Sequence, residues 1–305
     1  MDFVKQYMFK TITSQIKQSE LLHLLLSFVH SKQMLNFGQL VLVHHKAFGG
    51  KSSETHQLAA AIELLILSFD MFDDLEDLDN MKEPWMQVEP SIALNAATTL
   101  YTLSQQTVLA LSSPFKLQIL NALLQYSIQA MEGQHDDLQN TFSTEEECLK
   151  VMENKSGSLI ALACVSGMLL AEVNFPEVEK YAYQLGIAAQ IDNDFRDLFN
   201  PLKNDSTIQK KSLALLYLQK DYNEHALEVL GFLASKKDYN ETFGSMKQYK
   251  LKLAESGVAQ YLNVMKQIAL NRATIMIDKL TIDSNHIEDL KSHLIINSKP
   301  TNKER

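Results

Sequence analysis

Apolar residues recur at helical spacing along almost the whole chain, and this periodicity constrains the fold more than any other feature of the sequence. One such run consists of Leu58, Ile62, Leu65, Phe69 and Phe72. Residues three or four positions apart share one face of a helix, whereas the alternation typical of a half-buried strand is nearly absent. The sequence therefore predicts an all-α protein.

The prolines divide this pattern into segments. Those that lie where one helical pattern ends and another begins are Pro84, Pro90, Pro114, Pro176 and Pro201. A proline cannot continue a helix beyond its first turn, so this punctuation predicts about ten to twelve helices. Because no repeat or linker interrupts the pattern, we expect one helical domain over residues 1–297, followed by a polar tail at residues 298–305.

Composition narrows the class of protein. Only 10 residues are Gly and 6 are Pro among 305, which is too few for a turn-rich β-sandwich, and 46% of the residues are hydrophobic. The net charge of -9 argues against general binding to nucleic-acid phosphates, so no nucleic-acid partner is expected. Two cysteines cannot form a disulfide framework, and neither a signal peptide nor a membrane span is recognisable. We therefore expect a cytoplasmic protein.

Two acidic groups repeat one spacing, at the first, second and fifth positions of a helical segment. They are Asp73, Asp74 and Asp77, and Asn193, Asp194 and Asp197. At about 100° per residue, the members of each group lie on one side of their helix. Like charges this close destabilise a helix, which favours a bound counter-ion; Mg²⁺ fits, because it bridges carboxylates to substrate phosphates. A solvated acidic face is the alternative, and the repeated spacing disfavours it.

Taken with three further segments, these groups resemble the motifs of the trans-isoprenyl diphosphate synthases, in the same order. The further segments are Gly133-Gln134-His-Asp-Asp137, Lys155-Ser156-Gly157 and Lys210. The resemblance extends from about Phe48 to about Leu290. It implies the isoprenoid synthase fold, a bundle of helices around a central pocket for the prenyl donor.

The resemblance also implies a metal-assisted ionisation of an allylic isoprenyl diphosphate. Two or three Mg²⁺ ions, held by all six residues of the acidic groups, would neutralise the diphosphate as its C–O bond breaks. The implied diphosphate-binding residues are Lys155, Gln134, Lys210 and Lys82. Phe69 lies where the family sets the length of the donor tail, and ordinary core packing is the alternative for this residue. No catalytic base is identifiable.

The sequence departs from the family where the family holds its second substrate, isopentenyl diphosphate. Lys32-Gln-Met-Leu35 aligns with a Gly-Gly-Lys-Arg segment, Ile66 with a histidine, and Lys82-Glu83 with a pair of arginines. A diphosphate acceptor would meet an apolar residue and an added negative charge where it needs cations. We therefore expect an uncharged, electron-rich acceptor such as an aromatic ring.

Within the superfamily, this pattern resembles the ComQ-type tryptophan prenyltransferases of Gram-positive bacteria. The resemblance implies Mg²⁺-dependent transfer of a geranyl or farnesyl group to a tryptophan of a pheromone precursor peptide, a step in quorum sensing and competence. Two alternatives stay open. One is a chain-elongating synthase that uses isopentenyl diphosphate; the other is a non-catalytic regulatory subunit of such a synthase, at which only Asn193 hints.

Further expectations rest on the resemblance and on the chemistry of the substrates. Members of the family are commonly dimers, so a homodimer is expected. The prenyl donor and the lipidated product are amphiphilic, which is compatible with peripheral attachment at the inner face of the cell membrane. The motifs do not encode the length of the donor or the sequence of the acceptor peptide.

Overall fold

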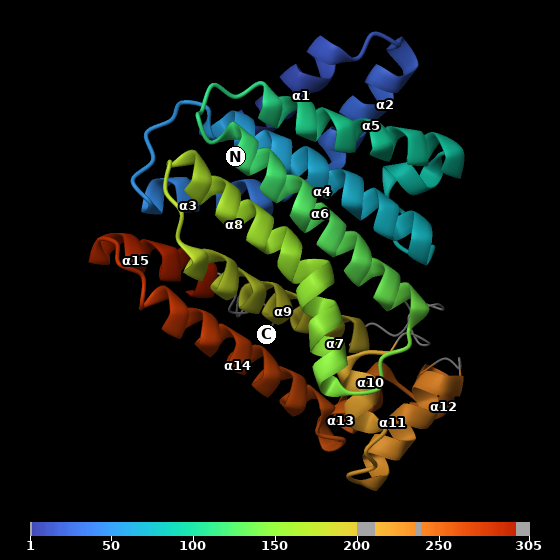
Figure 1. The fold of residues 1–305 in the computed structure, drawn as a ribbon. Helices are drawn as coiled ribbons and strands as arrows, with labels where there is room; N and C mark the ends of the chain where they lie inside the picture. The colour runs from blue at the N-terminus through green and yellow to red at the C-terminus, as the bar shows by residue number, and fades with distance from the viewer. Residues whose placement is uncertain (1, 200–210, 236–238, 297–305) are drawn as a thin grey trace. The chain divides into compact units, whose positions relative to one another are not determined.

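The computed structural model describes residues 2–199, 211–235 and 239–296, and every regular element in these ranges is a helix (Figure 1). The all-α class predicted from the apolar spacing is therefore confirmed. The longer helices account for the number that the prolines predicted, and short ones such as α10 (Leu213–Leu218) and α12 (Tyr239–Phe243) add to it.

The chain divides into two compact units, each built from several segments. The first unit holds residues 1–128, 158–182 and 274–305, and the second holds residues 129–157 and 183–273. Three long helices contribute residues to both units: α6 (Lys116–Gln139), α9 (Pro176–Leu198) and α14 (Val258–Ile277). The predicted polar tail lies outside the described residues.

Helix α4 (Thr55–Asp77) is at the core of the first unit. Every residue from Leu58 to Ser68 is buried, because α4 contacts other helices on several sides. These neighbours are α1 (Asp2–Gln15), α3 (Asn36–Ala47), α5 (Pro90–Leu109) and α8 (Ser158–Leu170). Helix α8 is apolar on all faces, as expected for a helix that neighbours cover all round.

Shorter elements complete the first unit. They are α2 (Ser19–Ser31), the 3₁₀ turn η1 (Pro84–Gln87), α15 (Ser284–Lys291) and the π-helical turn η4 (Ser292–Ile296). Pro84, Pro90 and Pro176 are the first residues of η1, α5 and α9, where their missing N–H group leaves no helical hydrogen bond unmade. These three prolines thus mark helix starts, as the sequence predicted, whereas Pro114 lies in the turn before α6 and Pro201 lies outside the described residues.

The second unit contains α7 (Glu145–Met152), the π-helical turn η2 (Glu153–Gly157), α11 (Glu224–Ser235) and α13 (Met246–Glu255), besides α10, α12 and its parts of α6, α9 and α14. A capping box opens α7, in which Thr144 and Glu147 each accept the other's backbone N–H. This box fixes the start of the segment that leads into η2.

Three glycines let backbones meet in the second unit. A Cβ atom added at Gly133 of α6 would lie 2.3 Å from the backbone nitrogen of Lys155 in η2. One added at Gly186 of α9 would lie 2.3 Å from the Cα of Gly157, at the end of η2. Only glycine leaves room for such contacts, so η2 is held closely against both α6 and α9.

Among the residues that the structure describes, no helix is both long enough and apolar enough to span a bilayer.

Candidate active site

The first acidic motif occupies the last turn of α4, just before Leu78 takes a left-handed backbone conformation with a φ of 55°. Asp73 and Asp77 lie one turn apart and are half-buried. A helix C-terminus carries the negative end of the helix dipole, and this turn contains no basic residue. Carboxylates are therefore unfavourable at this position unless a cation joins them.

Asp74 points toward the segment that follows α4. Its Oδ2 accepts a hydrogen bond from the indole Nε1–H of Trp85 at 2.7 Å, and its Oδ1 accepts one from the amide of Asn80 at 2.7 Å. Burial raises the pKa of this carboxyl to about 7, although both hydrogen bonds oppose the shift. Asp74 thus ties the motif to η1, and its role as a metal ligand stays a prediction.

Phe69 and Lys82 lie on either side of the motif in the chain. The Phe69 ring meets the rings of Phe72 and Tyr101 edge to face, each at 6.2 Å between centroids, so it lies against α5. Lys82 is exposed in the turn after α4. The effect of Phe69 on donor length and the contact of Lys82 with a diphosphate remain predictions.

The second acidic motif lies near the end of α9. Asp194 is half-buried, and its Oδ1 accepts a hydrogen bond from Gln190 at 3.1 Å; the Oε1 of Gln190 in turn accepts one from the hydroxyl of Ser156 at 2.7 Å. Burial is the main reason that the pKa of Asp194 rises to about 7. A chain of hydrogen bonds therefore links this motif to η2.

The three predicted ligands of the second motif differ in exposure. Asp197 is half-buried like Asp194, whereas Asn193 is exposed and its Oδ1 accepts a hydrogen bond from Arg196 at 2.6 Å. Arg196 also pairs with Asp192 at 3.2 Å. The structure therefore brings Asp194 close to η2 and leaves Asn193 on the exposed side of α9.

Two of the predicted diphosphate-binding residues lie in η2 or on α6, the helix that packs against it. Lys155 pairs with Asp137 of α6 at 2.9 Å, and both side chains are largely buried. Gln134, one turn before Asp137, has both amide atoms buried without a hydrogen-bond partner among the described residues. A buried amide without partners costs free energy, so this position suits a ligand that accepts its N–H. Lys210 lies outside the described residues.

The acidic residues fit a metal that is shared with a phosphate ligand. In the described part of the chain, no three His, Cys, Asp or Glu side chains are arranged to hold a metal ion by themselves. Mg²⁺ usually takes only one or two carboxylates and completes its shell with water and substrate phosphates. In each unit taken by itself, two half-buried carboxylates are compatible with such an ion: those of Asp73 and Asp77 in the first unit, and those of Asp194 and Asp197 in the second.

Asp137 is a functional candidate that was not predicted from the sequence, although it ends the Gly-Gln-x-x-Asp segment. Its carboxylate orients the ammonium of Lys155, which lies 18 residues further along the chain. The sequence motif contains Asp137, but its partner Lys155 could be identified only from the contact between α6 and η2.

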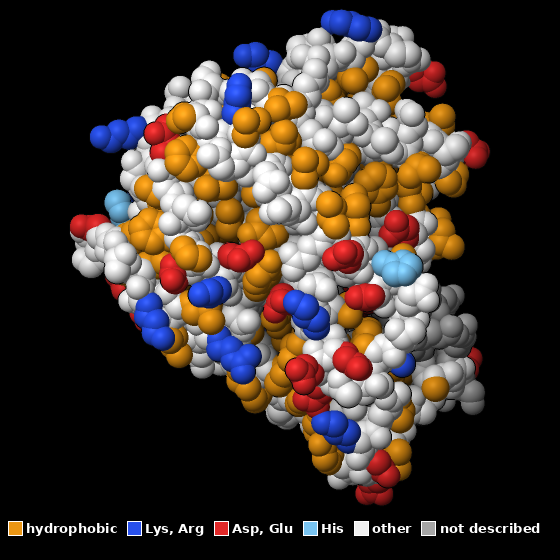
Figure 2. Space-filling view, viewed as in Figure 1, with side chains coloured by type: hydrophobic (Ala, Val, Ile, Leu, Met, Phe, Trp, Pro, Cys, Tyr) orange, Lys and Arg blue, Asp and Glu red, His pale blue; other side chains and the backbone are white. Residues whose placement is uncertain are grey.

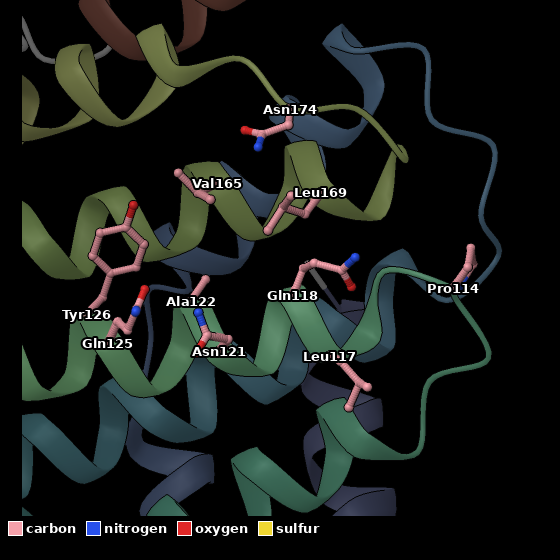
Figure 3. A pocket seen from close by; sticks show the side chains of 10 residues that line it. All are labelled: Pro114, Leu117, Gln118, Asn121, Ala122, Gln125, Tyr126, Val165, Leu169 and Asn174. Carbon is pink, nitrogen blue, oxygen red and sulfur yellow. The ribbon is translucent and has the colours of Figure 1, made fainter.

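A separate groove of about 590 Å³ lies in the first unit (Figure 3). Amide side chains of α6, among them Gln118, Asn121 and Gln125, line it, together with Val165 and Leu169 of α8. Asn174, from the segment between α8 and α9, also borders it. No residue of either acidic motif lines this groove, so it is distinct from the predicted donor site.

Similarities to known proteins extend over most of the chain. Residues 20–245 match the family model described as polyprenyl synthetase. The chain is 41% identical to the tryptophan prenyltransferase ComQ of Bacillus subtilis subsp. natto, over 96% of this chain and 90% of that protein. It is 37% identical to the tryptophan prenyltransferase ComQ of Bacillus subtilis strain 168, over 93% and 95% of the two chains.

The fold is similar to that of solved prenyl synthases. The geranylgeranyl pyrophosphate synthase of Corynebacterium glutamicum, whose crystal structure is a complex with isoprenyl diphosphate and magnesium, superposes with a TM-score of 0.80. The superposition covers 98% of each chain at 14% sequence identity. At this identity the likeness shows the isoprenoid synthase fold predicted from the motifs.

Proposed function

Because the chain belongs to the polyprenyl synthetase family, we propose that it transfers a geranyl or farnesyl group from its diphosphate to a tryptophan of a pheromone precursor peptide. The observation that carries this proposal is the near full-length similarity to two proteins named tryptophan prenyltransferase ComQ. The sequence supports it as well, because Leu35, Ile66 and Glu83 align with basic residues that hold an anionic acceptor in the family.

Residues of both acidic motifs would hold the metal. We propose Asp73, Asp77, Asp194 and Asp197 as ligands for two or three Mg²⁺ ions, since these carboxylates are half-buried near the ends of their helices. Bound Mg²⁺ supplies the positive charge that stabilises the diphosphate as it leaves. Asp74 and Asn193 belong to the same motifs, and in this structure their oxygens accept hydrogen bonds from neighbouring side chains.

Three side chains of the second unit would hold the diphosphate. Lys155, fixed by Asp137, contributes an ammonium, and Gln134 contributes an amide N–H that lacks a partner among the described residues. Lys210 and, in the first unit, Lys82 are proposed as further cations. As the C–O bond breaks, its electron pair stays with the diphosphate, and the allylic carbon forms a new bond to the electron-rich indole ring of the acceptor. The acceptor then loses one proton, so that the products are the neutral prenylated ring, the proton and the diphosphate.

Assembly and location are finer proposals. We propose a homodimer that uses an apolar face of the first unit. Figure 2 shows hydrophobic side chains gathered over α5 and α6, and Leu94 of α5 and Leu117 of α6 are 52% and 64% exposed. Contact between this face and a second copy of the chain would remove its apolar surface from water. Peripheral attachment to the membrane is proposed only from the amphiphilic donor and product.

The proposal is tested by mass spectrometry of a tryptophan-containing precursor peptide after incubation with the protein, Mg²⁺, and geranyl or farnesyl diphosphate in turn. We expect a gain of one prenyl unit with one of the two donors. The gain should disappear with a Trp→Ala peptide and with the double variant Asp73→Ala, Asp77→Ala. An unmodified peptide with both donors, together with a longer polyprenyl diphosphate when isopentenyl diphosphate is added, would instead establish a chain-elongating synthase.

A further inference from the structure

One face of α4 leads from the core of the first unit to the first acidic motif. Glu63, Ile66 and Asp70 follow one another at intervals of three and four residues, so they share this face. Asp73 and Asp77 continue the same spacing. Glu63 and Ile66 are buried, whereas Asp70 is 48% exposed and lies one turn before Asp73, so an acceptor that binds beside the motif would meet Asp70.

Lys32, at the end of α2, reaches into this face. Its ammonium lies 2.7 Å from Asp70 Oδ2 and 3.9 Å from Glu63 Oε2, and its side chain is only 13% exposed. The backbone at Lys32 is itself held in place, because Lys5 donates hydrogen bonds to the carbonyl oxygens of His30 and Lys32, each at 2.9 Å. The position of the ammonium is therefore set from two sides.

The side chain of Glu63 is held in place beside Lys32, because it also caps helix α3. The N-cap residue of α3, Leu35, has no side-chain group that could cap the helix. Glu63 supplies this cap from α4, since its Oε1 accepts the backbone N–H of Gly38 at 2.6 Å. Its side chain is fully buried, and its Oε2 accepts no hydrogen bond among the described residues, so Lys32 is its nearby counter-charge.

We propose that Asp70 and Glu63 determine the class of acceptor, because their contacts with the ammonium of Lys32 keep it from binding an anion. The ammonium of Lys32 is paired with Asp70, and the carboxyl of Glu63 lies on its other side. An alkyl diphosphate would have to displace Asp70 from Lys32 and would be repelled by that carboxylate, which is a repulsive device for specificity. An uncharged aromatic ring would not have to displace Asp70 from Lys32. This inference rests on the proposed transfer to a tryptophan.

Removing the charge of Asp70 tests the idea. The variant Asp70→Asn keeps the size of the side chain and frees the ammonium of Lys32 from its closest carboxylate. The matched control is Asp289→Asn, because Asp289 also pairs with a lysine, Lys46, at 2.7 Å in the first unit and is 45% exposed, against 48% for Asp70. Binding of isopentenyl diphosphate is measured by calorimetry with Mg²⁺ and a non-ionising thio-analogue of geranyl diphosphate present.

We expect Asp70→Asn to bind isopentenyl diphosphate about tenfold more tightly than the wild type, because one like charge within a few ångströms has been removed. Asp289→Asn should bind like the wild type. Adding Lys32→Met to Asp70→Asn should abolish the gain, because the freed ammonium causes it. Glu63→Gln, which retains an oxygen to cap α3, should give a smaller gain, since Glu63 lies further from Lys32.

Three results would overturn the inference: an unchanged affinity in Asp70→Asn, an equal gain in Asp289→Asn, or a gain that survives Lys32→Met. The calorimetric test contains no peptide, so its result does not depend on whether the protein prenylates a tryptophan. If Asp70→Asn gains affinity but the wild-type protein never modifies a tryptophan-containing peptide, the proposed function fails while the control of acceptor charge stands. Thermal unfolding of each variant shows that it remains folded.

Discussion

At the scale of single residues, the burial of His44 in α3 makes stability depend on pH. Its side chain is fully buried and stacks on the ring of Tyr181 at 5.9 Å, while its Nδ1 lies 2.7 Å from the carbonyl oxygen of Leu40. Burial lowers the pKa of His44 to about 4. Between this value and the ordinary value of about 6.5, the unfolded chain binds a proton that the folded protein does not.

We therefore predict that the contribution of His44 to the free energy of unfolding falls as the pH is lowered through this window. The loss should amount to about 2 kcal/mol between pH 7 and pH 5. It is measured by urea unfolding of the wild type and of His44→Phe at both pH values. The variant should lose less stability on acidification, whereas His23→Gln, at an exposed position, should follow the wild type. Parallel losses in wild type and His44→Phe would contradict the prediction.

The sequence identified charged residues of the site but not their contacts. The spacing of Asp73, Asp74 and Asp77 placed them on one side of a helix, and the structure agrees that α4 carries them. It could not show that Asp74 would bond to Trp85, or that Lys32 would meet Asp70, which lies 38 residues away. Such pairs form because separate helices are packed together, and no local pattern records which helices meet.

At the scale of elements, the contact of η2 with α6 sets the position of Lys155. Gly133→Ala would place a Cβ atom 2.3 Å from the backbone nitrogen of Lys155, and a backbone cannot move aside as a flexible side chain can. We predict a loss of about 1–3 kcal/mol in the free energy of unfolding, as for other overpacked sites. Because η2 must shift, the KM for the prenyl diphosphate should also rise.

The control for this substitution is Gly231→Ala in α11. A Cβ atom there would meet nothing within 4 Å, so alanine should stabilise the helix by about 0.5–1 kcal/mol through its higher helix propensity. Urea unfolding and donor kinetics are measured for both variants. If Gly133→Ala proves as harmless as Gly231→Ala, then the close contact does not position Lys155.

The sequence predicted the helices more accurately than it predicted the contacts between them. The spacing of Leu58, Ile62 and Leu65 is a local property, and these residues are indeed buried in α4. The contact of Gly133 with η2 has no such local signature, since a lone glycine in a helical pattern is also compatible with an exposed position. A Cβ atom added at Gly231 would meet no neighbour within 4 Å, so the presence of a glycine in a helix does not by itself indicate a close backbone contact.

At the scale of the whole molecule, the two acidic motifs belong to different units of the chain. The sequence predicted one domain of 1–297 from the lack of a linker, and that organisation stays a prediction. The overall fold was predictable because five short motifs occurred in a known order, which no single helix could have revealed. What the motifs leave open is whether both are needed to bind one ligand.

We predict that the donor diphosphate stabilises the protein only when Mg²⁺ is present and both motifs are intact. A non-ionising thio-analogue of geranyl diphosphate at 100 times its Kd should add about 2.7 kcal/mol to the free energy of unfolding, seen as a higher Tm. EDTA should abolish the increase, because the carboxylates of α4 and α9 would then repel the diphosphate. The double variants Asp73→Ala, Asp77→Ala and Asp194→Ala, Asp197→Ala should each abolish it too. An increase that survives either double variant would mean that one motif binds the donor alone.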